Sequence, residues 1–156
     1  MPALPALPTL LISALSVLPD WRAVVSMEFK AAVDALVWVG PAPEPALGCS
    51  ELAQALGLND TRLASPAART DQDYAGVQAA MAKGLIASAI APGWGGAAAA
   101  LARATRAGGL GAAVEADWTT AQWFTEAPGG LVLSLAQEDV EAFAALVPEA
   151  RRFGTV

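Results

Sequence analysis

The sequence predicts an α+β (α/β layered) domain in which helices cover a mixed β-sheet. Three observations lead to this fold class. Short apolar runs bounded by glycine or proline indicate strands, and longer segments with apolar residues at helical spacing indicate helices. The two kinds of segment are interspersed along the chain, which favours layers of helix packed on sheet. A length of 156 residues suits one domain, so residues 1–156 are expected to form a single folded unit.

The first third of the chain is predicted to contain three strands and one helix. Residues 9–18 form an uninterrupted apolar run of the length of a long buried strand. Residues 24–29 are a second, shorter strand candidate, and residues 34–40 a third that is closed by glycine and proline. Residues 50–56 are predicted to be helical, with Cys49 or Ser50 near the N-cap.

The middle of the chain is predicted to alternate between helix and strand. Residues 72–83 carry apolar side chains at helical spacing, and residues 85–90 read as a strand after a glycine. Residues 97–107 are rich in alanine, the strongest helix former, and two glycines end this helix. Residues 110–115 are then predicted to return as a strand.

The last quarter is predicted to close the sheet. Residues 119–124 form a short helix or turn, and residues 131–136 are a strong apolar strand that follows a proline–glycine–glycine turn. Residues 137–146 place apolar side chains on one helical face, and residues 152–156 form a final strand.

Composition excludes several kinds of chemistry. The chain has no histidine, which rules out histidine-based nucleophile systems and histidine-ligated metals. Its single cysteine, Cys49, allows no disulfide within the chain and no cysteine zinc cluster. A net charge of −6 without any basic run argues against nucleic acid and anionic membranes as partners. We therefore expect no metal site and no catalytic residue in this chain alone.

Low charge and an uncharged start of the chain bear on location and assembly. Only 15% of the residues are charged, so we expect a sizeable buried interface, as in a homodimer. Residues 1–18 are apolar, but they lack the basic residues of a signal peptide and the length of a membrane span. The expected location is the cytoplasm. Tryptophans are numerous but not interleaved with basic residues, which indicates packing rather than base stacking.

The strongest candidate for a binding site is the turn before the helix at residues 97–107. Gly95 and Gly96 would let a phosphate approach the backbone N–H groups at the start of that helix. The alternative is a tight turn that binds nothing, since residues 90–94 contain no acid, base or hydroxyl. Trp94 lies in this turn, and its side chain is predicted to fill space that a ligand would otherwise take.

Three further residues are candidates for ligand contacts. Ser50 and Glu51 stand at a predicted helix start, where ordinary capping is the competing interpretation. Glu126 precedes the proline–glycine–glycine turn, where its carboxylate would orient a substrate or remain solvated.

Several segments together resemble the C-terminal domain of the aminoimidazole ribonucleotide synthetase superfamily, and most of all phosphoribosylformylglycinamidine synthase (formylglycinamide ribonucleotide amidotransferase). They are PTLLISALSVLPD, MEFKAAVDALVWVG, LGCSELA, the segment at residues 83–115 and WFTEAPGGLVL, in the same order as in the family. The resemblance implies the layered fold of that domain. It also implies that ATP and magnesium belong to an N-terminal half of the complete enzyme, while this chain alone holds no cofactor.

The sequence departs from the family pattern at several positions. The family's His-Asp-x-Ser-x-Gly-Gly turn keeps only its glycines, Gly95 and Gly96. Glycines expected before Asp34 and in the Leu-Gly-Gly-Ser-Glu motif are replaced by Val33 and Cys49, and the basic residue after the Phe-Ser-Glu-Ser turn is Gly130. The polar contacts that the family makes at its turn are therefore lost here.

The resemblance leads to one main hypothesis and two alternatives. The chain would be a subunit or scaffold in purine biosynthesis that assembles with a separate N-terminal-type synthase subunit and is not catalytic alone. Alternatively, it is a degenerate nucleotide- or phosphate-binding or assembly module without enzymatic activity, with a phosphorylated small molecule as its ligand. A sister activity, such as selenophosphate synthesis or thiamine monophosphate phosphorylation, fits the LGCSE segment less well.

Overall fold

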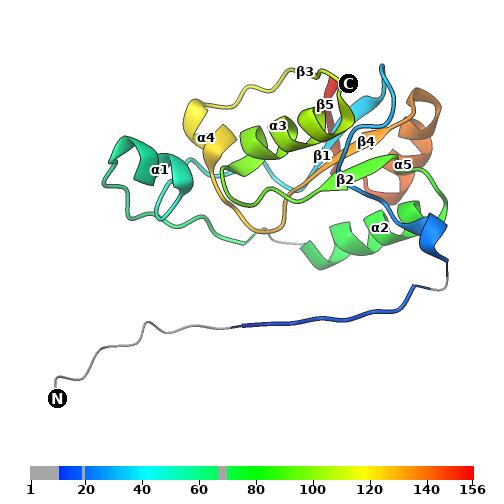
Figure 1. Ribbon diagram of the computed structural model, residues 1–156, viewed down its shortest axis with the longest axis horizontal. Helices are drawn as coiled ribbons and strands as arrows, with labels where there is room; N and C mark the ends of the chain where they lie inside the picture. Colours follow the sequence, from blue (N-terminus) through cyan, green and yellow to red (C-terminus); the bar gives the residue numbers. More distant parts are fainter. Residues whose placement is uncertain (1–10, 19, 67–69) are drawn as a thin grey trace.

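The computed structural model describes residues 11–18, 20–66 and 70–156, and it confirms the predicted α+β layering (Figure 1). The strands are β1 (Ala35–Val39), β2 (Ser88–Ile90), β3 (Ala113–Val114), β4 (Leu131–Leu135) and β5 (Arg151–Thr155). The α-helices are α1 (Glu51–Leu56), α2 (Thr70–Ala82), α3 (Gly96–Gly108), α4 (Thr120–Phe124) and α5 (Val140–Leu146), with 3₁₀ helices η1 (Trp21–Ala23) and η2 (Gln137–Asp139).

The sheet has the strand order β2-β4-β1-β5-β3, and every described pairing is antiparallel. The expectation of a mixed sheet was therefore wrong in this detail. Strands joined by a helix, such as β4 and β5 through α5, do run parallel to each other, but β1 lies between them. The crossovers that the sequence suggested are present, and it is the insertion of a third strand that makes each neighbour antiparallel.

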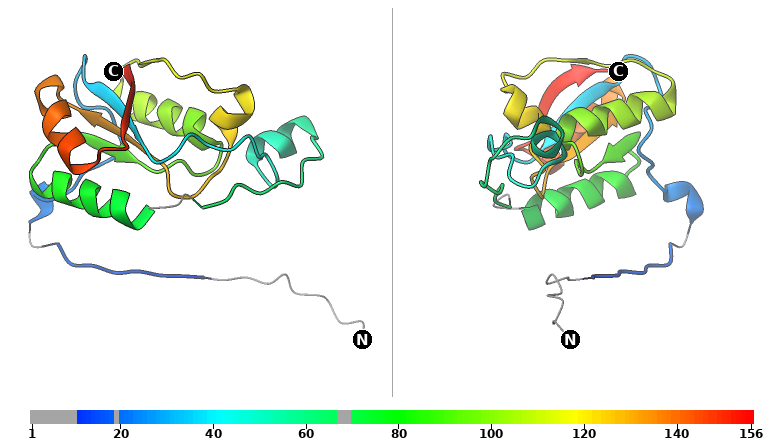
Figure 2. Two further views of the ribbon diagram at one scale, coloured as in Figure 1. Left: turned by 180° about the vertical axis from the view of Figure 1, so that it is seen from behind. Right: turned by 60° about the vertical axis from the view of Figure 1, so that its left-hand side comes forward.

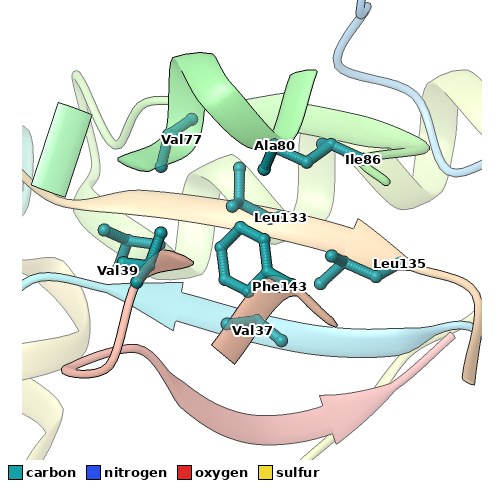
Figure 3. Packing of buried hydrophobic residues seen from close by; sticks show 9 residues of the cluster. Val37, Val39, Val77, Ala80, Ile86, Leu133, Leu135 and Phe143 are labelled. Atoms are coloured by element: carbon teal, nitrogen blue, oxygen red, sulfur yellow. The ribbon is translucent and has the colours of Figure 1, made fainter. Parts of the chain in front are cut away.

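Helices cover both faces of the sheet, and the alternation of β1 divides its side chains between two cores (Figure 2). Val37 and Val39 face α2 and α5, where they meet Phe143 (Figure 3). Leu36 and Trp38 face the other way, toward α3. All five residues of β1 are buried, which is expected for a central strand with helices on both sides.

Local signals placed most helices correctly. Ser50 is the N-cap of α1, and its Oγ accepts a hydrogen bond from the Ala53 N–H at 3.2 Å. Gly57 ends that helix in a left-handed conformation. The helices α2, α3 and α5 and the strands β1, β4 and β5 lie within one to three residues of their predicted bounds. Within the described residues, no helix is both long and apolar enough to cross a membrane.

The two strands predicted before β1 were wrong. Residues 11–18 form no strand and are exposed, while residues 9 and 10 lie outside the described part. Residues 24–29 follow the edge of β2, where the Ser26 carbonyl accepts from the Ala89 N–H at 3.0 Å, but they form no ladder. An apolar run becomes a strand only where a neighbouring strand takes up its backbone groups. The predicted strands at 85–90 and 110–115 are shortened for the same reason.

Val33 and Cys49, which replace two family glycines, are the non-glycine residues with positive φ, at 66° and 61°. We expect Val33→Gly to stabilise the fold by about 0.5–1 kcal/mol. It removes a left-handed strain of roughly 1–2 kcal/mol and returns part of it as chain entropy. Urea denaturation measures the effect.

Val24→Gly is the matched control, because Val24 is also exposed but has an ordinary φ of −71°. This second variant should be neutral or slightly destabilising. Equal losses of stability in the two variants would show that Val33 stores no strain.

Candidate functional site

The turn before α3 has the left-handed geometry that only glycine adopts without strain. Gly95 has φ 80° and Gly96 φ 65°. A Cβ at Gly96 would stand 2.7 Å from the carbonyl oxygens of both Trp123 and Thr125, so the backbone after α4 packs directly on the start of α3. These two glycines are therefore needed for the turn and for this close packing, independently of any ligand.

The Glu126 carboxylate joins the starts of two helices. Its Oε1 accepts the N–H of Gly95 at 2.9 Å and the N–H of Glu51 at 2.8 Å. Gly95 is the N-cap of α3, and Glu51 is the first residue of α1. The structure thus brings together three of the predicted site residues. The carboxylate lies where the N–H groups and dipoles of both helices favour a negative charge.

Thr125 explains why Glu126 is held at this point. Its side chain is buried, and its Oγ1 lies 2.7 Å from the Glu44 carbonyl oxygen and 2.8 Å from that of Ala121. These contacts tie the end of α4 to the loop before α1. The neighbouring Glu126 is therefore positioned between α1 and α3 rather than left in solvent.

Ser50, Glu51 and Trp94 take different roles from one another. Ser50 is buried and uses its hydroxyl to cap α1, while Glu51 contributes its backbone N–H and keeps its own side chain exposed. Trp94 is 77% exposed, so its indole does not fill a ligand space as predicted. Its carbonyl oxygen instead accepts a hydrogen bond from Arg103 Nη1 at 3.2 Å.

The residues at this site do not fit ATP with magnesium. Within the described part of the chain, no group of three or more acidic or cysteine side chains is arranged to hold a metal ion. The nearby cation, Arg103, is engaged with the turn's own carbonyl. The carboxylate at the turn is engaged with backbone N–H groups and would repel a phosphate. We therefore derive no phosphoryl-transfer step for these residues.

An aromatic cluster beside the β1–β5 pair was not identified as a site from the sequence. The ring centroid of Trp118 lies 5.0 Å from that of Trp38 and 4.7 Å from that of Trp123. Trp38 and Trp118 line a cavity of about 260 Å³ together with Phe153. Packing was the predicted role of the tryptophans, and it holds for these three, while Trp21 and Trp94 are exposed. The cluster combines residues far apart in sequence, so no local pattern announces it.

Gly130 stands where the family has a basic residue, and the space beside it is filled by an indole. A Cβ at Gly130 would lie 2.5 Å from the Trp38 ring. Trp38 is buried, and its Nε1 donates to the Pro41 carbonyl at 2.9 Å. A basic side chain therefore has no room here unless Trp38 moves.

Comparison with known proteins gives one family match. The model of the family described as AIR synthase related protein, C-terminal domain, matches residues 33–156. This range contains all five strands and the whole candidate site.

Solved structures with a similar fold come from two kinds of protein. Phosphoribosylformylglycinamidine synthase II from Thermotoga maritima superposes with a TM-score of 0.67 at 13% identity, covering 86% of this chain and 24% of that one. E. coli HypE, a hydrogenase maturation protein, gives a TM-score of 0.60 at 17% identity, covering 85% of this chain and 46% of the other. At such identities the likeness concerns the fold. The chain spans about a quarter to a half of the length of these structures.

Proposed function

The chain belongs to the AIR synthase related protein family, C-terminal domain, and from this premise we propose that it serves purine biosynthesis as a phosphoribosylformylglycinamidine synthase-type C-terminal domain. In this role it is a subunit or scaffold that pairs with a separate N-terminal-type synthase subunit. By itself it does not catalyse the reaction.

The observation that carries this proposal is the position of Glu126. Its carboxylate accepts hydrogen bonds from the N–H groups of Gly95 and Glu51, which are the groups that a phosphate would need. Residues 90–94 of the turn offer no polar side chain in exchange. A domain in this state keeps the family's packing but lacks its own means of holding an anionic substrate.

The choice of purine biosynthesis rests on two supports. The family model covers most of the chain, and several of the similar structures are phosphoribosylformylglycinamidine synthase II, including one described as complexed with FGAR. The sequence segments given above resemble the same enzyme in order. In the complete enzyme, ATP and magnesium would be held by the partner half, and the present domain would complete the assembly in the cytoplasm.

The alternative is a module for nucleotide or phosphate binding, or for assembly, with no enzymatic activity. It would keep a phosphate site at Gly95 and Gly96, and it requires the Glu126 carboxylate to leave the two N–H groups. Binding of ligand to the isolated chain separates this alternative from the main proposal.

Tryptophan fluorescence tests the proposal directly, because Trp94 is exposed and adjacent to Gly95. Formylglycinamide ribonucleotide is added to the purified chain, followed by Mg-ATP. We expect no saturable change up to millimolar ligand, since Glu126 already occupies the N–H groups.

The controls are Trp94→Phe and Trp21→Phe, because the two side chains are 77% and 75% exposed and only Trp94 adjoins the turn. A saturable signal that Trp94→Phe removes and Trp21→Phe keeps would favour the phosphate-binding alternative. With ammonia included, release of phosphate above a heat-killed control would overturn the claim that the chain is not catalytic alone. Co-purification with an N-terminal-type synthase subunit would support the main proposal.

A further inference from the structure

We propose that residues 11–18, here called the arm, add as a strand to the outer edge of β3 in a second copy of the chain. Two copies would exchange arms in this way and form a symmetric dimer. The inference rests on the exposed arm and on the free sheet edge, and it does not depend on the proposed function.

The arm has the composition of a buried strand but is not buried. Its sequence, LISALSVL, contains no charged residue. Leu15 is 98% exposed, and Leu11, Ile12 and Val17 are nearly as open. An apolar patch of this kind on a folded domain marks an interaction surface. The arm has apolar side chains at both odd and even positions, which suits a strand that is covered on both faces.

The arm has no partner within its own domain. Figures 1 and 2 show it running outside the body on the side of α2, while β3 lies on the opposite side of the molecule. The nearer sheet edge is that of β2, where the Ser26 carbonyl already takes the Ala89 N–H. A second molecule is therefore the source of the edge that the arm requires.

The outer edge of β3 offers unpaired backbone groups. The strand pairs with β5 on one side, and in the described part of the chain no strand pairs with its other side. The Glu115 N–H donates to the Phe153 carbonyl at 2.7 Å, and the register pairs Ala113 with Thr155. In an antiparallel pair the bonded positions alternate, so the N–H and carbonyl of Val114 point away from β5.

The chemistry of the two partners matches. Residues 109–114, which lead into and form the edge, are uncharged and small, with sequence GLGAAV. An uncharged arm meets no unpaired charge there, whereas charged side chains are the usual means of protecting an edge from strand addition. Backbone hydrogen bonds would give affinity, as in other cases where an extended segment joins a sheet. Because each copy has one arm and one edge, a two-fold dimer satisfies both.

Sedimentation of the full chain tests the proposal. The wild type should be a dimer at tens of micromolar protein, and Leu15→Lys should weaken dimerisation by about tenfold or more, because a charge would enter the new sheet. Leu63→Lys is the matched control, since Leu63 is 67% exposed but lies outside the arm. It should leave the dimer unchanged. Circular dichroism verifies that each variant is folded.

A second variant tests the edge. Val114→Pro removes the outward N–H while leaving the pairing positions on either side, and it should also weaken the dimer. Mixing Leu15→Lys with Val114→Pro should restore dimers, because one intact arm then meets one intact edge. A monomeric wild type, a Leu15→Lys variant that remains dimeric, or a mixture that stays monomeric would each overturn the proposal.

Discussion

Replacement of Gly96 by alanine is expected to destabilise the domain by about 2–4 kcal/mol. The new Cβ would stand 2.7 Å from the carbonyl oxygens of Trp123 and Thr125, and backbone atoms held by α4 cannot move aside easily. Overpacking of this kind costs roughly 1–3 kcal/mol, and the left-handed φ of 65° adds about 1–2 kcal/mol for any residue with a Cβ. The midpoint of urea unfolding measures the loss.

Gly93→Ala is the control for Gly96→Ala. It lies in the same turn, but an added Cβ there meets nothing within 4 Å. Its effect should be within about 0.5 kcal/mol of zero. If the two variants lose stability equally, the turn tolerates a Cβ at Gly96 by shifting, and the close packing between α3 and residues 123–125 is not a constraint.

Gly130→Lys, which restores the basic residue of the family pattern, is expected to destabilise the domain by about 1–3 kcal/mol rather than to restore a site. The Cβ would overlap the buried ring of Trp38, at 2.5 Å. That ring is fixed by its hydrogen bond to Pro41 and by its edge contact with Trp118. Thermal or urea unfolding shows the direction of the effect.

A double-mutant cycle identifies Trp38 as the cause. In a Trp38→Val background, which is itself less stable, the added cost of Gly130→Lys should be smaller by about 1 kcal/mol or more. Gly111→Lys is the control for a new lysine at a glycine with open space around it. Additive effects of Trp38→Val and Gly130→Lys would mean that the lysine meets some other obstacle.

Both glycines show how this domain differs from a ligand-binding relative while keeping the fold. Gly96 is used to pack α3 on the backbone after α4, and Gly130 makes room for an indole. Glu126 supplies the negative charge that the helix starts favour. A position that matches the family motif can thus be retained for packing alone, and a match at Gly95 and Gly96 does not by itself indicate a bound phosphate.

Sequence patterns predicted the central elements of the fold because their signals are local. Apolar spacing located α2, α3 and α5, and the Ser50 cap and Gly57 defined α1. The run at residues 9–18 shows the limit of such signals, since the same apolar pattern led to a strand that the described residues 11–18 do not form. Composition records that a segment can be buried, but it does not record which strand is available to pair with it.

The candidate site was predicted as residues and not as an arrangement. Gly95, Glu51 and Glu126 were each singled out, but their meeting through one carboxylate oxygen joins positions 31 and 75 residues apart in sequence. No spacing rule predicts a contact over such separations. The cluster of Trp38, Trp118 and Trp123 escaped prediction as a cavity lining for the same reason.

The sequence by itself determined the layered fold class, most helices with their caps, the central strands and the resemblance to one family, because each depends on residues close together in the chain. Tertiary structure alone decided the antiparallel strand order, the exposure of Trp94 and of the arm, and the use of Glu126 as the anion between α1 and α3. These features depend on which distant segments pack against each other. Packing is selected by the free energy of the whole domain, which no single segment encodes.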